Sequence, residues 1–294
     1  MHAALVFVQL AFAGFHVIGK AVLGHMEPMA LAGYRVLLAT PIVFLLAWRL
    51  EHFRPAKRDL PVLAVLGLLG VFLNQMLFIT GLRHTTATNA GIIMPSIPVF
   101  TAAIAAAFGV ERLSWRQGLG IGVAVFGAAV MLNPLQFQVG SGLLLGNLLL
   151  LLNALAYAGY LVLQRPVLRR VPPLTLTAWA FMFGSLGVLA VSAPAMARVP
   201  FADEPRLVWW GLAYIVLIPT ALNYALNTWA VGRSSPSTAA AYIPLQPAGA
   251  GVLAAIFLGE EAGWREGLGF ALIITGLILV SQGLRRNGRG KAAT

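Results

Sequence analysis

Ten apolar segments of about 20 residues each follow one another along this chain, with short polar joints between them. A segment of that length crosses the hydrocarbon core of a bilayer, where a helix is the only open-chain element that satisfies its own backbone hydrogen bonds. Only 10% of the 294 residues are charged, whereas roughly a quarter are charged in an ordinary soluble domain. The sequence therefore predicts an all-α integral membrane protein embedded in a lipid bilayer.

Glycine, proline and charged residues mark the joints and hence the expected helix boundaries. We expect ten transmembrane helices at residues 3–22, 29–49, 61–82, 87–109, 115–133, 142–164, 173–193, 206–229, 236–258 and 264–283. Two of these helices begin with recognisable start signals. Ser114 and Gln117 form a capping box before the fifth helix, and Ser235 followed by Pro236 places an N-cap and a first-turn proline at the ninth.

Basic residues are distributed unevenly between the two sets of joints. If the N-terminus is cytoplasmic, 14 of the 20 Lys and Arg residues lie in cytoplasmic joints, five lie in the opposite joints, and only Arg35 lies within a helix. The positive-inside rule then predicts that both termini are cytoplasmic and that residues 285–294 form a basic cytoplasmic tail. Because these charges form no continuous patch, the net charge of +11 does not indicate a nucleic-acid partner.

The second half of the sequence repeats the first. Early in each half, LAFAGFHVIGK from Leu10 matches LAYAGYLVLQR from Leu155. At an offset of 149 residues the matching pairs are Asn74 and Asn223, Thr88 and Ser237, Pro95 and Pro244, Pro98 and Pro247, Glu111 and Glu260, Trp115 and Trp264, Gly118 and Gly267, Gly120 and Gly269, and Gly127 and Gly276. We therefore divide the chain into two five-helix repeats, residues 1–138 and 139–284, which are called the first and second halves below.

An odd number of helices in each repeat has a mechanical consequence. The second copy must enter the membrane from the opposite side, so the two halves are expected to be related by a pseudo-twofold axis in the membrane plane. Such inverted repeats let one structure open alternately to either side of the membrane, which favours a transporter. A duplication that merely builds a stable helix bundle is the alternative.

Two long stretches at matching positions carry a family resemblance. They are MPSIPVFTAAIAAAFGVERLSWRQGLGIGVAVFGAAVML from Met94 and IPLQPAGAGVLAAIFLGEEAGWREGLGFALIITGLILV from Ile243, each with a proline-bearing helix, an interfacial glutamate and a Gly-rich helix. From Leu5 to Gly283 the chain resembles the drug/metabolite transporter superfamily, in its ten-helix EamA-type branch. The resemblance implies a central cavity lined by the first four helices of each half. It also implies peripheral fifth and tenth helices that can form a homodimer contact, and a bacterial inner membrane as the location.

Members of that family export or import amino acids, other metabolites, nucleotide-sugars or drugs. The resemblance therefore implies secondary transport of a small-molecule substrate by alternating access, and our leading interpretation is an exporter of a metabolite such as an amino acid. A translocator of lipids or xenobiotics is the alternative.

Two ionisable side chains, His16 in the first helix and Arg35 in the second, are predicted to lie in hydrocarbon, where such groups usually face a cavity. Both are candidates for substrate binding or gating. Arg35 lies about six residues inside its helix, or roughly 9 Å, so extension of its head group to the interface is the alternative.

Polar amides and aromatic side chains within the helices complete the predicted cavity lining. The amides are Asn74, Gln75, Asn89, Asn153, Asn223, Asn227 and Gln246, and the aromatic residues are Phe12, Tyr157, Tyr160, Trp179, Tyr224 and Tyr242. Each amide can bind the substrate or bond to a neighbouring helix, and each aromatic ring can enclose the substrate or simply pack.

Other repeated residues suggest hinges and packing contacts. The proline pairs Pro95/Pro98 and Pro244/Pro247 remove backbone donors within the fourth and ninth helices, so they are candidate gate hinges, with a static kink as the alternative. Glu111 and Glu260 stand before helix N-termini, where an acid interacts favourably with the helix dipole. The small residues Gly118, Gly120, Gly122, Gly267 and Gly269 fit close helix contact.

All nine acidic residues fall in joints or at helix ends, so there is no buried carboxylate of the kind that commonly carries protons or sodium through a transporter. We therefore expect a uniporter or exchanger, in which proton coupling would have to involve His16 or the substrate itself. The chain has no cysteine and no H-E-x-x-H, G-x-S-x-G or phosphate-loop motif. A membrane enzyme, a metal site and a cofactor are accordingly not expected.

Overall fold

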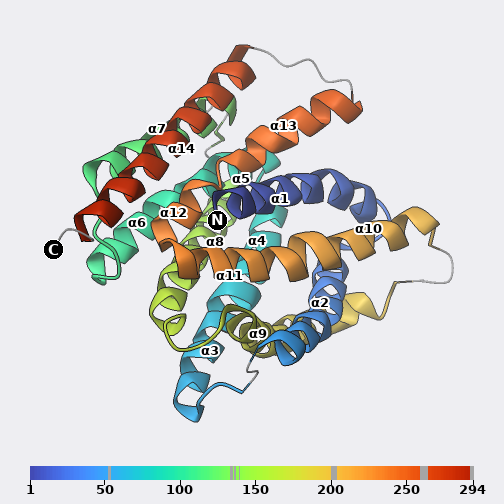
Figure 1. The fold of residues 1–294 in the computed structure, drawn as a ribbon. Coiled ribbons are helices and arrows are strands. Elements are labelled where there is room, and N and C mark those ends of the chain that lie inside the picture. Colours follow the sequence, from blue (N-terminus) through green and yellow to red (C-terminus); the bar gives the residue numbers. More distant parts are fainter. Residues whose placement is uncertain are drawn as a thin grey trace.

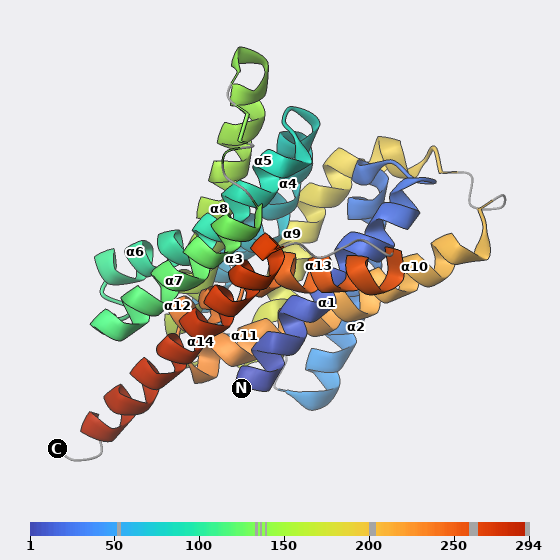
Figure 2. The same ribbon diagram turned by 90° about the horizontal axis from the view of Figure 1, so that it is seen from above.

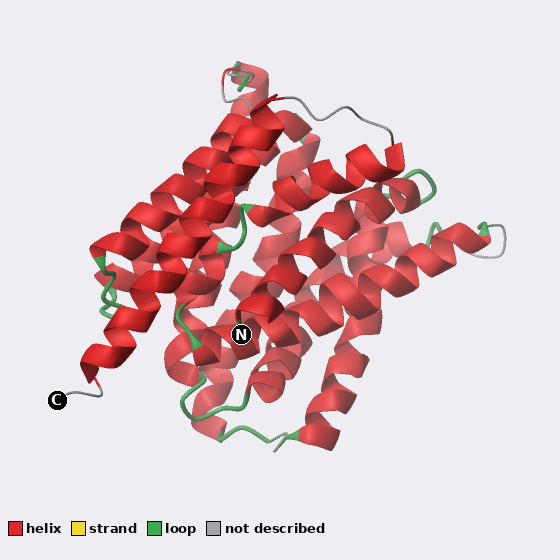
Figure 3. Ribbon diagram, turned by 45° about the horizontal axis from the view of Figure 1, so that its top comes forward, coloured by secondary structure: helices red, strands yellow, loops and turns green. Residues whose placement is uncertain are grey.

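The computed structural model describes residues 1–51, 54–132, 135, 137–138, 140–199, 204–258 and 264–291, and every regular element within them is a helix (Figure 1; Figure 3). Six segments are uninterrupted helices: α1 His2–Leu23, α2 Pro28–Leu50, α7 Trp115–Leu132, α8 Ser141–Val167, α9 Pro173–Met196 and α14 Trp264–Lys291. The third segment joins η1 Lys57–Asp59, α3 Leu60–Gly67, η2 Leu68–Leu73 and α4 Asn74–Arg83. The fourth joins α5 Ala87–Ile93, η3 Met94–Ser96 and α6 Ile97–Ala107; the eighth joins α10 Arg206–Val216, η6 Leu217–Leu222 and α11 Asn223–Arg233; and the ninth joins α12 Pro236–Ala241 and α13 Leu245–Leu258.

These ten segments correspond to the ten expected helices, and eight of them are long and apolar enough to cross a membrane. Among the described residues, the ninth is divided into helices of six and 14 residues, and the tenth contributes the apolar stretch Gly267–Gln282. Eight of the ten expected membrane-spanning helices are therefore confirmed by length and composition among the described residues. α14 also continues to Lys291 instead of ending near residue 283, and a helix that leaves the bilayer can continue in water.

The two helix start signals are confirmed. A side-chain oxygen of Gln117 accepts a hydrogen bond from the Ser114 N–H at 2.9 Å, and Ser114 Oγ accepts one from the Gln117 N–H at 3.3 Å. Ser235 Oγ accepts a hydrogen bond from the Thr238 N–H at 3.3 Å, with Pro236 in the first turn.

The third and eighth segments each contain a π-helical stretch, η2 and η6. The two stretches begin at Leu68 and Leu217, which are separated by the 149-residue offset of the sequence repeat. Local π-helical widening is rare and occurs frequently at functional sites. The repeat thus includes an irregularity that the sequence analysis did not predict.

α7 and α14 lie side by side at the edge of the molecule (Figure 1; Figure 2). A Cβ atom added to Gly120 would lie 2.7 Å from the carbonyl oxygen of Gly276, and one added to Gly127 would lie 2.8 Å from that of Gly269. The two helices therefore run antiparallel with their backbones in contact, as small residues allow. Because the sequence repeat pairs Gly120 with Gly269 and Gly127 with Gly276, both halves contribute the same patch, as a twofold axis between two copies requires.

Helices of the two halves are interleaved. α1 lies between α13 and the α10–α11 segment, and α2 packs along α9 (Figure 1). Large apolar side chains such as those of Trp115, Phe126 and Trp210 are exposed on the outside. A bilayer accommodates such a surface, whereas water does not.

Candidate functional site

Arg35 lies where the two halves meet. Its Nε donates a hydrogen bond to Thr220 Oγ1 at 2.6 Å, and its guanidinium carbon lies 5.0 Å from the centre of the Phe15 ring. Phe15 belongs to α1 in the first half, and Thr220 belongs to η6 in the second. Thr220 is fully buried near the middle of the segment Arg206–Arg233, so the head group of Arg35 does not extend to the membrane interface.

The position of Thr220 follows from the residue before it. Pro219 has no N–H, so the carbonyl of Ile215, four residues earlier, loses its usual helical donor. Thr220 Oγ1 donates to that carbonyl at 2.6 Å instead. Because the hydroxyl proton is used in this bond, a lone pair of the same oxygen is available to accept the hydrogen bond from Arg35.

Three tyrosines of the second half surround this contact. Tyr157 and Tyr160 of α8 stack with their ring centres 5.8 Å apart. Tyr224 of α11 packs edge-on against Phe181 at 4.8 Å, and its hydroxyl donates to the carbonyl of Gly70 in η2 at 3.2 Å. Tyr157 and Tyr224 both lie near Arg35. The π-helical stretches of both halves thus contribute to the same region of the protein.

Polar groups hold the tyrosines in place. Asn227 Nδ2 donates to the Tyr157 hydroxyl at 3.3 Å, and the hydroxyls of Tyr160 and Thr228 lie 3.2 Å apart. We call the following residues the central cluster: Phe15, Arg35, Tyr157, Tyr160, Thr220, Tyr224 and Asn227.

In the described part of the chain, the partners of Arg35 are all neutral. The ion pairs seen there join Asp59 to Arg170, Glu27 to Arg198 and His25 to Glu204, and none includes Arg35. A cation that is removed from water without a counter-ion is expensive, and in membrane proteins such a group commonly marks a substrate pathway.

Five predicted site residues are bonded to neighbouring helices or joints. Asn223 Nδ2 donates to the Val8 carbonyl at 2.9 Å, Gln246 Nε2 to Gln9 Oε1 at 2.7 Å, and Asn153 Nδ2 to the Asn74 carbonyl at 2.5 Å. The Tyr242 hydroxyl and His2 Nδ1 are 2.6 Å apart, and Asn89 Nδ2 donates to the Gln138 carbonyl at 2.9 Å. For the four amides these contacts are of the kind expected if they bond to neighbouring parts of the protein, and a role for any of the five residues in substrate binding stays a prediction.

The remaining predicted residues lie in several places. Gln75 is buried in α4, and Phe12 packs in the core formed mainly by α2, α9 and α10. Trp179 contacts the rings of Phe44 and Phe183, away from the Arg35 face of α2. The side chain of His16 lies outside the described part of the structure.

The proline pairs occupy interruptions in the fourth and ninth segments. Pro95 lies within η3 and Pro98 just after it. Pro244 closes the turn that separates α12 from α13, and Pro247 follows in α13. Their role as hinges stays a prediction.

Sequence analysis missed Phe15, Pro219 and Thr220. A proline followed by threonine in the middle of an apolar segment was the available signal, because this pair both frees a carbonyl and supplies a hydroxyl to bond it.

Three carboxylates of the first half bind the second half at one end of the molecule. We call this end, where α2 ends and α3 begins, the basic end, because Arg49, Arg54, Lys57 and Arg58 lie there. Glu111 accepts hydrogen bonds from Ser235 Oγ at 2.6 Å and from the Ser237 N–H at 3.2 Å, which places it at the N-terminus of α12.

The other two carboxylates, those of Glu51 and Asp59, also bind residues of the second half. A carboxylate oxygen of Glu51 accepts from the Thr175 N–H at 2.8 Å near the N-terminus of α9, and buried Asp59 pairs with Arg170 at 2.5 Å. A carboxylate at a helix N-terminus satisfies free N–H groups and the helix dipole together. The halves are therefore firmly joined at the basic end.

Comparison with protein families gives two matches. Residues 2–133 and 144–282 each match the EamA-like transporter family. The two ranges correspond closely to the first and second halves, which indicates that the halves are duplicated copies.

Relatives with known sequences cover nearly the whole chain. Protein WALLS ARE THIN 1 of Arabidopsis thaliana is 27% identical over 96% of this chain and 82% of its own length. A protein of Streptantibioticus cattleyicolor, named a probable terminal-alkyne amino-acid exporter, is 31% identical over 88% of this chain and 85% of its own length. A solved crystal structure that is 17% identical covers 97% of this chain and 99% of its own with a TM-score of 0.79, which shows that the fold is shared.

Proposed function

Because the chain belongs to the EamA-like transporter family, whose members are membrane transporters and not enzymes, we propose that it exports a small metabolite that carries a carboxylate, such as an amino acid. The observation that carries this proposal is Arg35, a cation at the contact between the halves whose described partners are neutral. Its guanidinium matches the geometry of a carboxylate, which can accept two parallel hydrogen bonds. A bound substrate would thus supply the missing counter-ion.

The surroundings of Arg35 suit an amphipathic substrate. Phe15, Tyr157 and Tyr224 offer ring faces to its apolar part, and Asn227 offers an amide. The relative named as a probable amino-acid exporter supports an amino acid as the first substrate to test.

In this proposal the halves, residues 1–138 and 139–284, have opposite orientations in a bacterial inner membrane, with both termini and the basic segment 285–294 in the cytoplasm. The antiparallel, symmetric contact of α7 with α14 supports the inverted repeat. The excess of Lys and Arg at the basic end supports its cytoplasmic location.

Alternating access requires contacts that form on one side while their counterparts open on the other. Glu111 and its partner Ser235 at the basic end have repeat counterparts, Glu260 and Thr86. Thr86 is the N-cap of α5, just as Ser235 is the N-cap of α12. Glu260 lies outside the described residues. We propose that the proline interruptions act as hinges when the basic end opens.

Glu111→Gln is expected to open the basic end more often, because a hydrogen bond to a charged acceptor is worth about 1.5–3 kcal/mol and the substitution weakens two such bonds. The chain has no cysteine, so Ala240→Cys, at a fully buried site in α12, supplies a single reporter. Its labelling by an impermeant maleimide from the cytoplasmic side should become roughly tenfold faster. Glu27→Gln is the control, because that exposed carboxylate is 3.9 Å from Arg198 at the opposite end; equal labelling in both variants would contradict a gating role for Glu111.

A homodimer through α7 and α14 is also proposed. Cβ atoms added to Gly118, Gly122 and Gly267 would meet nothing within 4 Å, so these glycines leave a flat strip outside the α7–α14 contact. Small residues of this kind allow close approach of a second pair of helices in lipid.

The proposed function is tested by counterflow into proteoliposomes across amino acids, organic acids, amines, sugars and nucleotide-sugars, with and without a pH gradient. Saturable counterflow of carboxylates, with no response to the gradient, is the expected result. Transport of amines alone would contradict the role of Arg35, and uptake of lipids or xenobiotics alone would favour the alternative function. A pH-gradient dependence that is lost in His16→Ala would overturn the uncoupled mechanism.

A further inference from the structure

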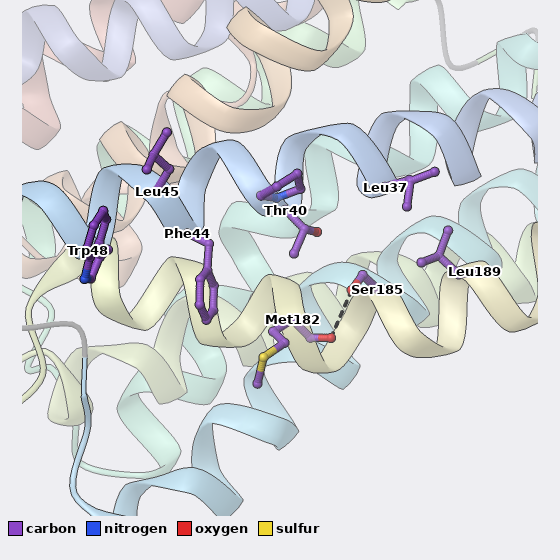
Figure 4. Close-up of a pocket in the computed structure, with 9 residues that line it drawn as sticks. Leu37, Thr40, Phe44, Leu45, Trp48, Met182, Ser185 and Leu189 are labelled. Carbon is purple, nitrogen blue, oxygen red and sulfur yellow. Dashed lines mark hydrogen bonds between the residues drawn. The ribbon is translucent and has the colours of Figure 1, made fainter.

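An apolar groove of about 690 Å³ lies between α2 and α9 (Figure 4). Leu37, Phe44 and Trp48 line it from α2, and Met182 and Leu189 line it from α9. The two hydroxyls in its wall bond to their own helices: Thr40 Oγ1 donates to the Val36 carbonyl at 2.7 Å and Ser185 Oγ to the Met182 carbonyl at 2.9 Å. The groove therefore presents an almost wholly apolar surface.

This groove faces away from the central cluster. Arg35 and Leu37 are two positions apart on α2, which separates them by about 200° around the helix. Leu37, Phe44 and Trp48 follow at intervals of seven and four residues and so form one stripe opposite Arg35. Trp48 is 60% exposed on this outer face, which places the groove against the acyl chains of the bilayer.

A second cavity of about 420 Å³ continues the groove toward the basic end. It shares Phe44 with the first cavity and is lined also by Arg54, Pro55, Leu60 and Trp179. Arg54 is exposed there, and exposed Arg49, Lys57 and Arg58 lie on the same stretch of chain. An apolar channel thus ends in a group of cations.

In the described part of the chain no carboxylate forms an ion pair with these four cations. Glu51 accepts a hydrogen bond from Thr175, and Asp59 pairs with Arg170. We propose that the groove binds a phospholipid with an anionic headgroup, one acyl chain lying between α2 and α9 and the phosphate at Arg54. Two features select this occupant. The apolar groove matches an acyl chain, and the cations at its end match the negative charge of the headgroup.

The test is native mass spectrometry of the full chain, purified in detergent and titrated with dioleoyl phosphatidylglycerol or dioleoyl phosphatidylcholine. The unaltered protein should retain one phosphatidylglycerol in preference to phosphatidylcholine. Arg54→Gln should reduce that preference roughly fivefold, which is the effect of one basic residue at an anionic membrane surface. The control Arg116→Gln removes a cation that lies 5.9 Å from the Trp115 ring at the start of α7, away from the groove, and should leave the preference unchanged.

A groove-filling variant tests the acyl-chain site separately. Thr40→Phe should abolish the retained lipid without changing counterflow, and Leu45→Trp, at a 53% exposed position, replaces it if the first variant elutes as an aggregate. Equal retention of the two lipids by the unaltered protein, equal losses in Arg54→Gln and Arg116→Gln, or full retention by folded groove-filling variants would each overturn the proposal.

Discussion

Arg35→Gln is expected to lower saturable counterflow at least about 30-fold, because removal of one partner from a buried charge pair is worth roughly 2 kcal/mol or more. The substitution keeps a side-chain N–H that can reach Thr220 but removes the charge that would bind the substrate carboxylate. Arg35→Lys should also be impaired, since an ammonium group cannot make the bidentate contact of a guanidinium.

The stability of Arg35→Gln distinguishes this role from a structural one. A partly buried cation whose described partners are neutral contributes little to the stability of the folded protein, so its removal should leave the melting temperature unchanged or raise it. Counterflow and thermal unfolding in detergent are measured on the same preparation.

The matched control for Arg35→Gln is Arg198→Gln. Arg198 is an exposed arginine whose ion pair with Glu27 spans 3.9 Å. Exposed pairs of this kind contribute little to stability, so neither transport nor melting temperature should change. Wild-type counterflow in Arg35→Gln, or a loss of transport explained by unfolding, would refute a substrate-binding role.

Gly127→Ala is expected to destabilise the protein by about 1–3 kcal/mol, the range typical of overpacked contacts. The added methyl group would lie 2.8 Å from the carbonyl oxygen of Gly269 and 2.8 Å from Leu272 Cβ. Backbone atoms cannot move aside as a flexible side chain can, so α7 and α14 would have to separate.

Gly142→Ala, at the start of α8, is the control, because its added Cβ would have no neighbour within 4 Å and Gly142 lies outside both the α7–α14 contact and the proposed dimer strip. Alanine is a better helix former than glycine by about 1 kcal/mol, so this variant should be at least as stable as the unaltered protein. Thermal unfolding in detergent compares the two variants directly, and an equal decrease in both would show that the α7–α14 glycine contact has no special importance. Gly276→Ala, the repeat counterpart of Gly127→Ala, should behave like it.

Several features of the site could be predicted from single residues, while others depended on neighbours. Arg35 is the one basic residue within an apolar segment, and this isolation was enough to select it. Its partner Thr220 could not be selected in the same way, because a threonine in an apolar segment is common and becomes significant only beside Pro219 and opposite α2. Trp179 illustrates the converse: its aromatic side chain suits a substrate cavity, but packing places its ring beside Phe44, where it lines the outer cavity near Arg54 and not the central cluster.

The sequence by itself determined that the protein lies in a lipid bilayer, how many helical segments it has, and that its two halves are repeats. In hydrocarbon only a helix satisfies the backbone hydrogen bonds of a long apolar segment. The 149-residue offset pairs the residues of the two halves from the sequence alone, without knowledge of any contact. Tertiary structure alone decided which residues face the interior, that Glu111 reaches the start of α12, that η2 bonds to Tyr224, and that η6 bonds to Arg35. The physical reason is that both lipid and protein interior are apolar, so helical periodicity in a membrane protein does not distinguish them, and only the packing of one helix against another does.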